Sequence, residues 1–161
     1  MANPTFVRTV RERLHPGLYP GLLQSAGSPY DMLLARSRGR LANDVFGVVA
    51  LAPGQDALAL VEAARDDIEA RFGALCYRRQ IVLHLLVLGP IEAWRDAVAA
   101  LCADRTGFRG VMIQSVYVVD PDTGASHRSV SRWGALRYSR ASTRDAGQVQ
   151  GAVDQALPAR A

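Results

Sequence analysis

Two apolar runs dominate the hydrophobic pattern of this chain. Residues 80–88 are apolar almost throughout, which is typical of a strand buried on both faces at the centre of a sheet. Residues 111–119 form a second strand-like run, and the apolar side chains between the two runs recur at helical spacing over 91–103. If the two strands are parallel, this order predicts a right-handed crossover through the intervening helix.

The N-terminal part adds helices and a hairpin. Amphipathic spacing predicts helices over 5–14 and 56–72. Strand-like runs at 30–36 and 45–52 are joined by a polar link, which favours an antiparallel hairpin. A further short helical turn is expected over 19–24.

The C-terminal part begins with a turn and then loses its apolar pattern. Asp120-Pro-Asp-Thr-Gly124 predicts a tight turn, because Pro, Asp and Gly hold the positions that such a turn requires. A strand over 125–131 would then return beside 111–119. Large apolar residues are scarce from Trp133 onward, so residues 136–161 are interpreted as a polar, flexible tail with weak helix near 149–157.

Together these elements predict one globular α/β (α+β) domain over residues 1–135. Its expected order is α-β-β-α-β-α-β-β, with a mixed sheet of about five strands and helices packed on it. The chain has 161 residues and is 49% hydrophobic, which suffices for one core.

Composition excludes several classes of protein. The longest apolar run is far shorter than the roughly 20 residues of a membrane-spanning helix, and the N-terminus has no apolar segment of a secretory signal. Two cysteines, Cys76 and Cys102, are too few for a disulfide scaffold. We therefore expect a soluble, cytoplasmic protein with free, mostly buried thiols and no membrane span.

All 19 basic residues are arginine, so no lysine is present to act as a base, a Schiff-base former or a phosphate-loop ligand. Arginine binds carboxylates and phosphates through two parallel hydrogen bonds, although GC-rich coding alone also favours it. The net charge of +4 is unevenly spread, with segments 1–40 and 125–144 basic and segment 54–72 acidic. The folded protein is therefore expected to be electrically polarised.

Candidate catalytic residues lack evident partners in the sequence. His84 lies within the first apolar run, and a dyad with Cys76 or Cys102 is the enzyme hypothesis that it allows. A core imidazole bonded to the backbone is the alternative. The two cysteines lack the spacing and the additional ligands of a zinc site, and packing in the core explains them as well.

Acidic residues offer two further hypotheses. Asp120 and Asp122 would suit Mg²⁺ or Ca²⁺, but a turn also explains them. The order of helix, hairpin, helix and central strand loosely resembles a restriction-nuclease core, with Asp31, Asp44 and Glu62 as candidate acids. The second hairpin strand has neither the acid nor the Lys that this chemistry needs. We therefore predict no catalytic residues, no metal and no cofactor.

Segment 127–140 is the best positive indication of a ligand. Its arginines suit phosphates and its aromatic residues suit stacked bases, a combination typical of single-strand binders. The candidate nucleic-acid-binding residues are Arg128, Arg132, Trp133, Arg137, Tyr138 and Arg140. A solvated edge strand, in which arginine blocks edge pairing, is the alternative.

Residues 80–96, QIVLHLLVLGPIEAWRD, carry a family resemblance. The segment resembles one in the cytosolic N-terminal domain of some bacterial rhomboid-type membrane proteases, where an apolar strand also leads into Pro-x-x-x-Trp and a charged helix. The resemblance implies a non-catalytic accessory or ligand-sensing domain. It implies no protease activity, because this chain has no membrane segment and no Ser–His pair in helices.

We therefore expect a non-catalytic binding or interaction module with a protein partner or a homo-oligomeric assembly. A nucleic-acid-binding protein that uses segment 127–140 is the alternative. A nuclease-like or cysteine/histidine enzyme is the second alternative.

Overall fold

The structure, a computed structural model, describes residues 4–23, 27–38, 42–94, 110–130 and 138–157. In this part of the chain, six strands form one mixed sheet in the order β1-β2-β3-β4-β5-β6. The strands are β1 (Gly21–Leu23), β2 (Tyr30–Arg38), β3 (Ala42–Ala50), β4 (Gln80–Leu88), β5 (Val111–Val119) and β6 (Ser126–Val130). The α-helices are α1 (Pro4–Leu14), α2 (Ala57–Phe72) and α4 (Tyr138–Asp154), and two 3-10 helices are η1 (Gly73–Tyr77) and η2 (Ile91–Ala93).

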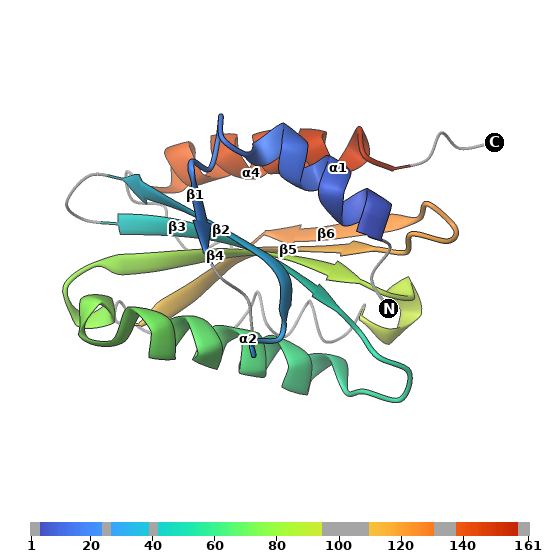
Figure 1. Cartoon of the computed structure of the whole chain (residues 1–161), viewed down its shortest axis with the longest axis horizontal. Coiled ribbons are helices and arrows are strands. Elements are labelled where there is room, and N and C mark those ends of the chain that lie inside the picture. Colours follow the sequence, from blue (N-terminus) through green and yellow to red (C-terminus); the bar gives the residue numbers. More distant parts are fainter. Residues whose placement is uncertain (1–3, 24–26, 39–41, 95–109, 131–137, 158–161) are drawn as a thin grey trace.

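Helices cover both faces of the sheet (Figure 1). Helices α1 and α4 lie on one face, where their apolar residues pack against Phe46, Val48 and Leu86. Helix α2 lies on the opposite face and packs against Val45 and Leu83. The fold is therefore a mixed sheet between two layers of helices, which is an α+β arrangement.

Strand β4 lies inside this sandwich with parallel neighbours on both sides, β3 and β5. Every residue from Ile81 to Leu88 is buried. This confirms the central strand that the apolar run predicts, because a strand covered on both faces has no solvent side to make polar. The parallel pairing of β4 and β5 also confirms the orientation that the crossover requires.

Two antiparallel pairs extend the sheet on either side, as the hairpin patterns predict. Strand β2 pairs with β3, and β5 pairs with β6. At the turn between β5 and β6, the backbone N–H of Asp120 donates to the carbonyl of Ala125 at 2.9 Å, and Gly124 has a φ of 69°. Glycine tolerates this left-handed conformation without steric cost, which explains its place in the turn.

The first edge of the sheet differs from the expectation. The short helical turn expected over 19–24 is instead strand β1, which makes the sheet six-stranded rather than about five-stranded. A Cβ atom at Gly21 would lie 2.9 Å from the carbonyl oxygen of Ala35. The lack of a side chain at Gly21 thus permits the close approach of β1 to β2.

The C-terminal region also differs from the flexible tail expected over 136–161. Helix α4 occupies most of it, and its residues Val149 and Val153 are fully buried against the sheet. A few well-spaced apolar residues suffice to dock this helix, because tertiary packing supplies most of a helix's stability. Of the helix expected over 91–103, only residues up to Trp94 lie within the described residues.

Gly47 of β3 is the tightest packing point among the described glycines. A Cβ atom there would overlap the ring of Tyr30. The ring cannot easily move, since the Tyr30 hydroxyl donates to the carbonyl of Ala64 on α2 at 2.6 Å.

We expect Gly47→Ala to lower the free energy of unfolding by about 1–3 kcal/mol through overpacking. Urea denaturation measures this, with Gly17→Ala as the control because nothing lies within 4 Å of that position. Equal stability of the two variants would contradict this packing.

Candidate functional site

The residues predicted to bind nucleic acid are divided between two elements. Arg128 lies on the edge strand β6 and is exposed. Tyr138 and Arg140 belong to the first turn of α4. The others lie outside the described residues: Arg132, Trp133 and Arg137. The use of segment 127–140 as a binding surface therefore stays a prediction.

His84 is fully buried in the middle of β4. Its neighbours Leu83 and Leu85 face α2, so alternation along the strand directs His84 toward the face covered by α1 and α4. There its Nδ1 lies 2.7 Å from the hydroxyl oxygen of Ser115 on β5. This histidine is therefore a buried core residue with a polar neighbour on the adjacent strand.

Cys76 lies on the other side of the sheet, in the apolar cluster beneath α2. Its thiol donates to the carbonyl oxygen of Glu69 at 3.9 Å, and burial, with a smaller effect of Glu69, raises the pKa of the thiol. A raised pKa leaves less of the reactive thiolate at neutral pH. The structure thus separates Cys76 from His84, and Cys102 lies outside the described residues.

Asp120 and Asp122 are used by the turn itself. Oδ1 of Asp120 accepts hydrogen bonds from the backbone N–H groups of Asp122 at 3.0 Å and Thr123 at 3.3 Å. Desolvation acts to raise the pKa of Asp120, but hydrogen bonds from Thr123 and Asp122 together outweigh it and lower that pKa. Among the described residues, no three His, Cys, Asp or Glu side chains gather as metal ligands.

The three acids of the nuclease hypothesis do not converge. Asp31 is exposed near one end of β2, at the register shift between Tyr30 and Met32, and Met32 pairs with Val48 on β3. Asp44 lies about 13 Å further along β3, at roughly 3.3 Å per residue. Asp44 lies two residues from Phe46 on β3, so both side chains point to the face covered by α1 and α4. Glu62 is exposed on α2, which covers the opposite face.

Among the described residues, five buried polar side chains lie in the amino-terminal halves or middles of the three parallel strands. They are Asn43, Asp44, His84, Gln114 and Ser115. Gln114 sits where the register between β4 and β5 shifts, so a bulge inserts it into the ladder. The placement of Asp44 and His84 on adjacent strands was not predicted, because strand register is not visible in the sequence.

One of these buried groups, Asp44, forms an ion pair with Arg36 on β2. Nη2 of Arg36 lies 2.5 Å from Oδ2 of Asp44, whose side chain is 0% exposed. The guanidinium carbon of Arg36 also lies 5.3 Å from the centre of the Tyr19 ring, a cation–π arrangement. Tyr19 in turn packs on Phe46, with ring centres 5.9 Å apart. The pair therefore ties β2 and β3 to the segment that follows α1.

Removal of one partner from this pair should be costly. We expect Asp44→Ala to lower the free energy of unfolding by about 3 kcal/mol or more, because the charge of Arg36 would lose its partner in a largely desolvated place. The double variant Arg36→Met/Asp44→Leu should cost less than the two single substitutions summed. Denaturant unfolding of the four proteins checks this. Additive losses would contradict the direct interaction.

The described arginines differ in whether an acid lies beside them. Both arginines of α2 are paired with acids, Arg65 with Asp66 at 3.9 Å and Arg71 with Asp67 at 2.5 Å. Several arginines elsewhere form no ion pair with the described residues: Arg11 on α1, Arg78 and Arg79 before β4, Arg128 on β6 and Arg144 on α4.

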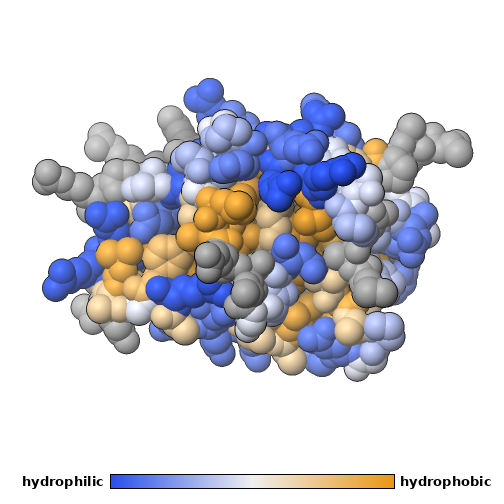
Figure 2. Space-filling view, viewed as in Figure 1, coloured by the Kyte–Doolittle hydropathy of each residue, from blue (hydrophilic) through white to orange (hydrophobic). Residues whose placement is uncertain are grey.

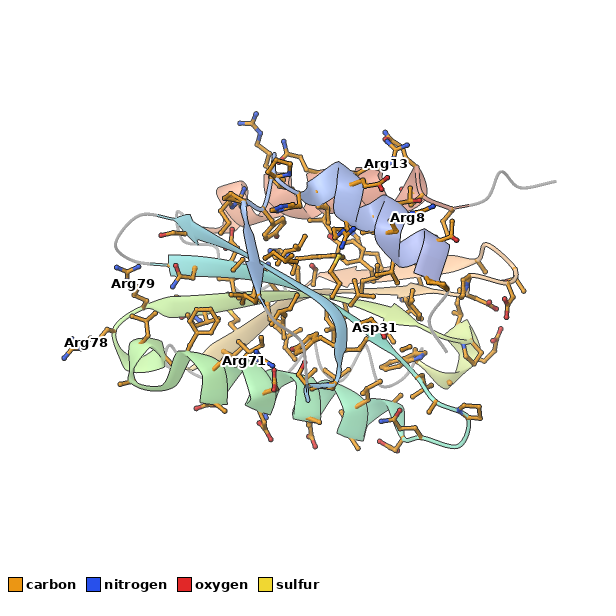
Figure 3. All side chains as sticks on the ribbon, viewed as in Figure 1. Arg8, Arg13, Asp31, Arg71, Arg78 and Arg79 are labelled. Atoms are coloured by element: carbon orange, nitrogen blue, oxygen red, sulfur yellow. The ribbon has the colours of Figure 1, made fainter. Side chains whose placement is uncertain are left out.

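Figure 3 shows Arg78 and Arg79 at one end of the molecule, with side chains directed away from the sheet. Arg78 is exposed and Arg79 is partly exposed. This doublet was not predicted from the sequence. Its only signal is the Tyr-Arg-Arg run directly before the central strand.

An apolar surface is also present. Figure 2 shows apolar side chains toward the middle of this side of the molecule, with hydrophilic residues above and beside them. Leu22 on the edge strand β1 is 57% exposed. A single exposed leucine is ordinary on a protein surface, so the expected protein partner or homo-oligomer stays a prediction.

Comparisons with family models, with curated proteins and with solved structures found no match to this chain. The resemblance to the cytosolic domain of rhomboid-type proteases therefore remains a hypothesis. Within the described residues, no helix has the length and apolar character needed to cross a membrane.

Proposed function

We propose that this chain is a non-catalytic binding module that recognises a polyanion. The observation that carries the proposal is the distribution of arginine partners. The described arginines of α2 are neutralised by neighbouring acids, whereas Arg11, Arg78 and Arg79 have no acidic partner in the described part of the chain. Unpaired arginines provide charge and hydrogen-bond donors for phosphate or sulfate groups.

The candidate catalytic groups support the non-catalytic part of the proposal. His84 is buried against Ser115, and Cys76 is buried with a raised pKa. Asp120 accepts hydrogen bonds from its own turn. Each of these groups has a structural role, and a reaction would require several of them to meet at one accessible place.

Fluorescein-labelled heparin tests polyanion recognition, with uncharged dextran as the control polymer. We expect heparin to bind with an affinity that falls steeply between about 50 and 200 mM salt, because displaced counterions drive such binding. Fluorescence anisotropy of the labelled polymer measures this. No binding at the lower salt concentration would contradict the proposal.

A charge variant distinguishes a defined surface from net charge. Glu62→Gln/Glu92→Gln removes two exposed carboxylates from α2 and η2 and raises the net charge of +4 by two. If unpaired arginines form a local site, heparin affinity should change little, because charges beyond about 8 Å are screened at physiological salt. Affinity that simply rises with net charge would argue against a local site.

A further inference from the structure

We infer that helix α4 is a detachable lid, which undocks from the sheet and unfolds while the rest of the fold stays intact. The inference goes beyond the proposed function and does not depend on it. It rests on three observations: the small part of α4 that is buried, two interior glycines without a packing role, and the face of the sheet that α4 covers.

Few side chains anchor α4 to the sheet. Of those that the structure describes on this helix, Val149, Ala152 and Val153 are buried, and all three lie within its last two turns. Between Tyr138 and Val149, the sequence has no apolar residue larger than alanine. This stretch therefore has little apolar surface to bury, although burial of an apolar face supplies most of the stability of a helix in a protein.

Helix α2 is anchored along its length and serves as an internal reference. It has 16 residues against the 17 of α4. The Asp56 side chain caps its start by accepting a hydrogen bond from the backbone N–H of Ala59 at 2.7 Å. No glycine interrupts its sequence. Its buried residues are Ala57, Leu60, Val61, Ala64 and Ile68.

Two glycines inside α4, Gly147 and Gly151, weaken the helix. A Cβ atom added at either position would meet nothing within 4 Å in the part of the chain that the structure describes, beyond the adjoining backbone of the helix itself. No close approach requires glycine there, in contrast to Gly47 on β3. A glycine inside a helix lowers the stability of the helix roughly fivefold in equilibrium relative to alanine, because it loses more backbone freedom.

A detached α4 would not remain helical. Isolated helices of its length are marginal in water even when they are rich in alanine. The two glycines and the serine, threonine and valine residues of α4 lower its intrinsic helicity further. Undocking and unfolding of this helix are therefore one event, and its glycines make that event easier.

The surface beneath α4 is apolar. Helix α4 lies beside α1 and against β5 (Figure 1). Its buried valines belong to the same apolar cluster as Tyr117 and Val119 of β5, and Tyr117 is 1% exposed. Opening of α4 therefore brings part of this face of the sheet into contact with solvent.

The other layers stay in place when α4 opens. Helix α1 keeps Phe6, Val10 and Leu14 buried on the same face, and α2 covers the opposite face. A hydrogen bond joins α1 to the end of α4, from Nη1 of Arg13 to Oε1 of Gln155 at 2.5 Å, and it is exposed to solvent. An exposed contact of this kind contributes little to stability, because water competes for both groups.

Hydrogen exchange of the backbone amides of the full chain, measured by nuclear magnetic resonance at increasing urea below the unfolding transition, tests the inference. Amides from Val149 to Val153 should exchange through an opening that depends weakly on urea, because it exposes little surface. Amides of β4 should exchange through global unfolding, with a steep dependence. Equal free energies and equal urea dependences for the two groups would overturn the inference, since α4 would then open only with the whole protein.

Gly147→Ala/Gly151→Ala tests the role of the glycines. It should slow exchange in α4 roughly twentyfold, about fivefold for each glycine replaced. Exchange that does not slow in this variant would overturn the inference, because unfolding of the helix would then not be part of the opening.

Gly17→Ala is the matched control. A Cβ atom at Gly17 also meets nothing within 4 Å, and this residue lies outside the helices. Alanine there restricts the unfolded chain, so it should slow global unfolding and leave the exchange of α4 unchanged. Slower exchange of α4 in this control, to the same extent as in β4, would assign the opening to global unfolding and overturn the inference.

Discussion

The complete burial of β4 is the constraint on which the rest of the structure depends. Its residues from Ile81 to Leu88 are apolar apart from His84, and both faces of the strand must be shielded from water. Helix α2 supplies the cover on one face, and α1 and α4, from the two ends of the chain, supply it on the other (Figure 1). The hairpin partners then complete the sheet on either side of the parallel strands.

This arrangement determines where polar chemistry can occur. Among the described residues, the buried side chains of the sheet are apolar except for a few polar ones in the amino-terminal halves and middles of β3, β4 and β5. One of these, Asp44, pairs with Arg36. A buried ion pair is a weak source of stability, since desolvation offsets most of the attraction between its charges. The pair joins β2 to β3 and, through the Tyr19 ring, to the segment that follows α1.

The pairing of surface charges differs from one element to another. The acids of α2 neutralise its own arginines, Arg65 and Arg71. The doublet before β4 has no such partner in the described part of the chain. A net charge of +4 is thus expressed unevenly, and one end of the sheet carries uncompensated arginine. Uneven fields of this kind attract polyanions more effectively than the net charge alone suggests.

The sequence predicts the central strand, the two hairpins and α2 because each depends on local pattern. Alternation, apolar runs and turn residues such as those from Asp120 to Gly124 are visible without tertiary information. Strand β1 was expected as a helical turn, and only a weak helix near 149–157 was expected where α4 packs on the sheet, because Gly21 and Val149 acquire their roles only through neighbours distant in sequence. The Arg78-Arg79 doublet escaped prediction for the same reason, since the presence of an acidic partner beside an arginine depends on tertiary neighbours that the sequence does not show.

Nuclear magnetic resonance of the arginine Nε–Hε groups tests the central claim most directly. During titration with unlabelled heparin at low salt, we expect saturable shifts for Arg78 and Arg79, while Arg65 and Arg71, paired on α2, remain unchanged. Salt should reverse the shifts. Shifts confined to the paired Arg65 and Arg71, or spread evenly over all arginines, would contradict recognition by unpaired arginines.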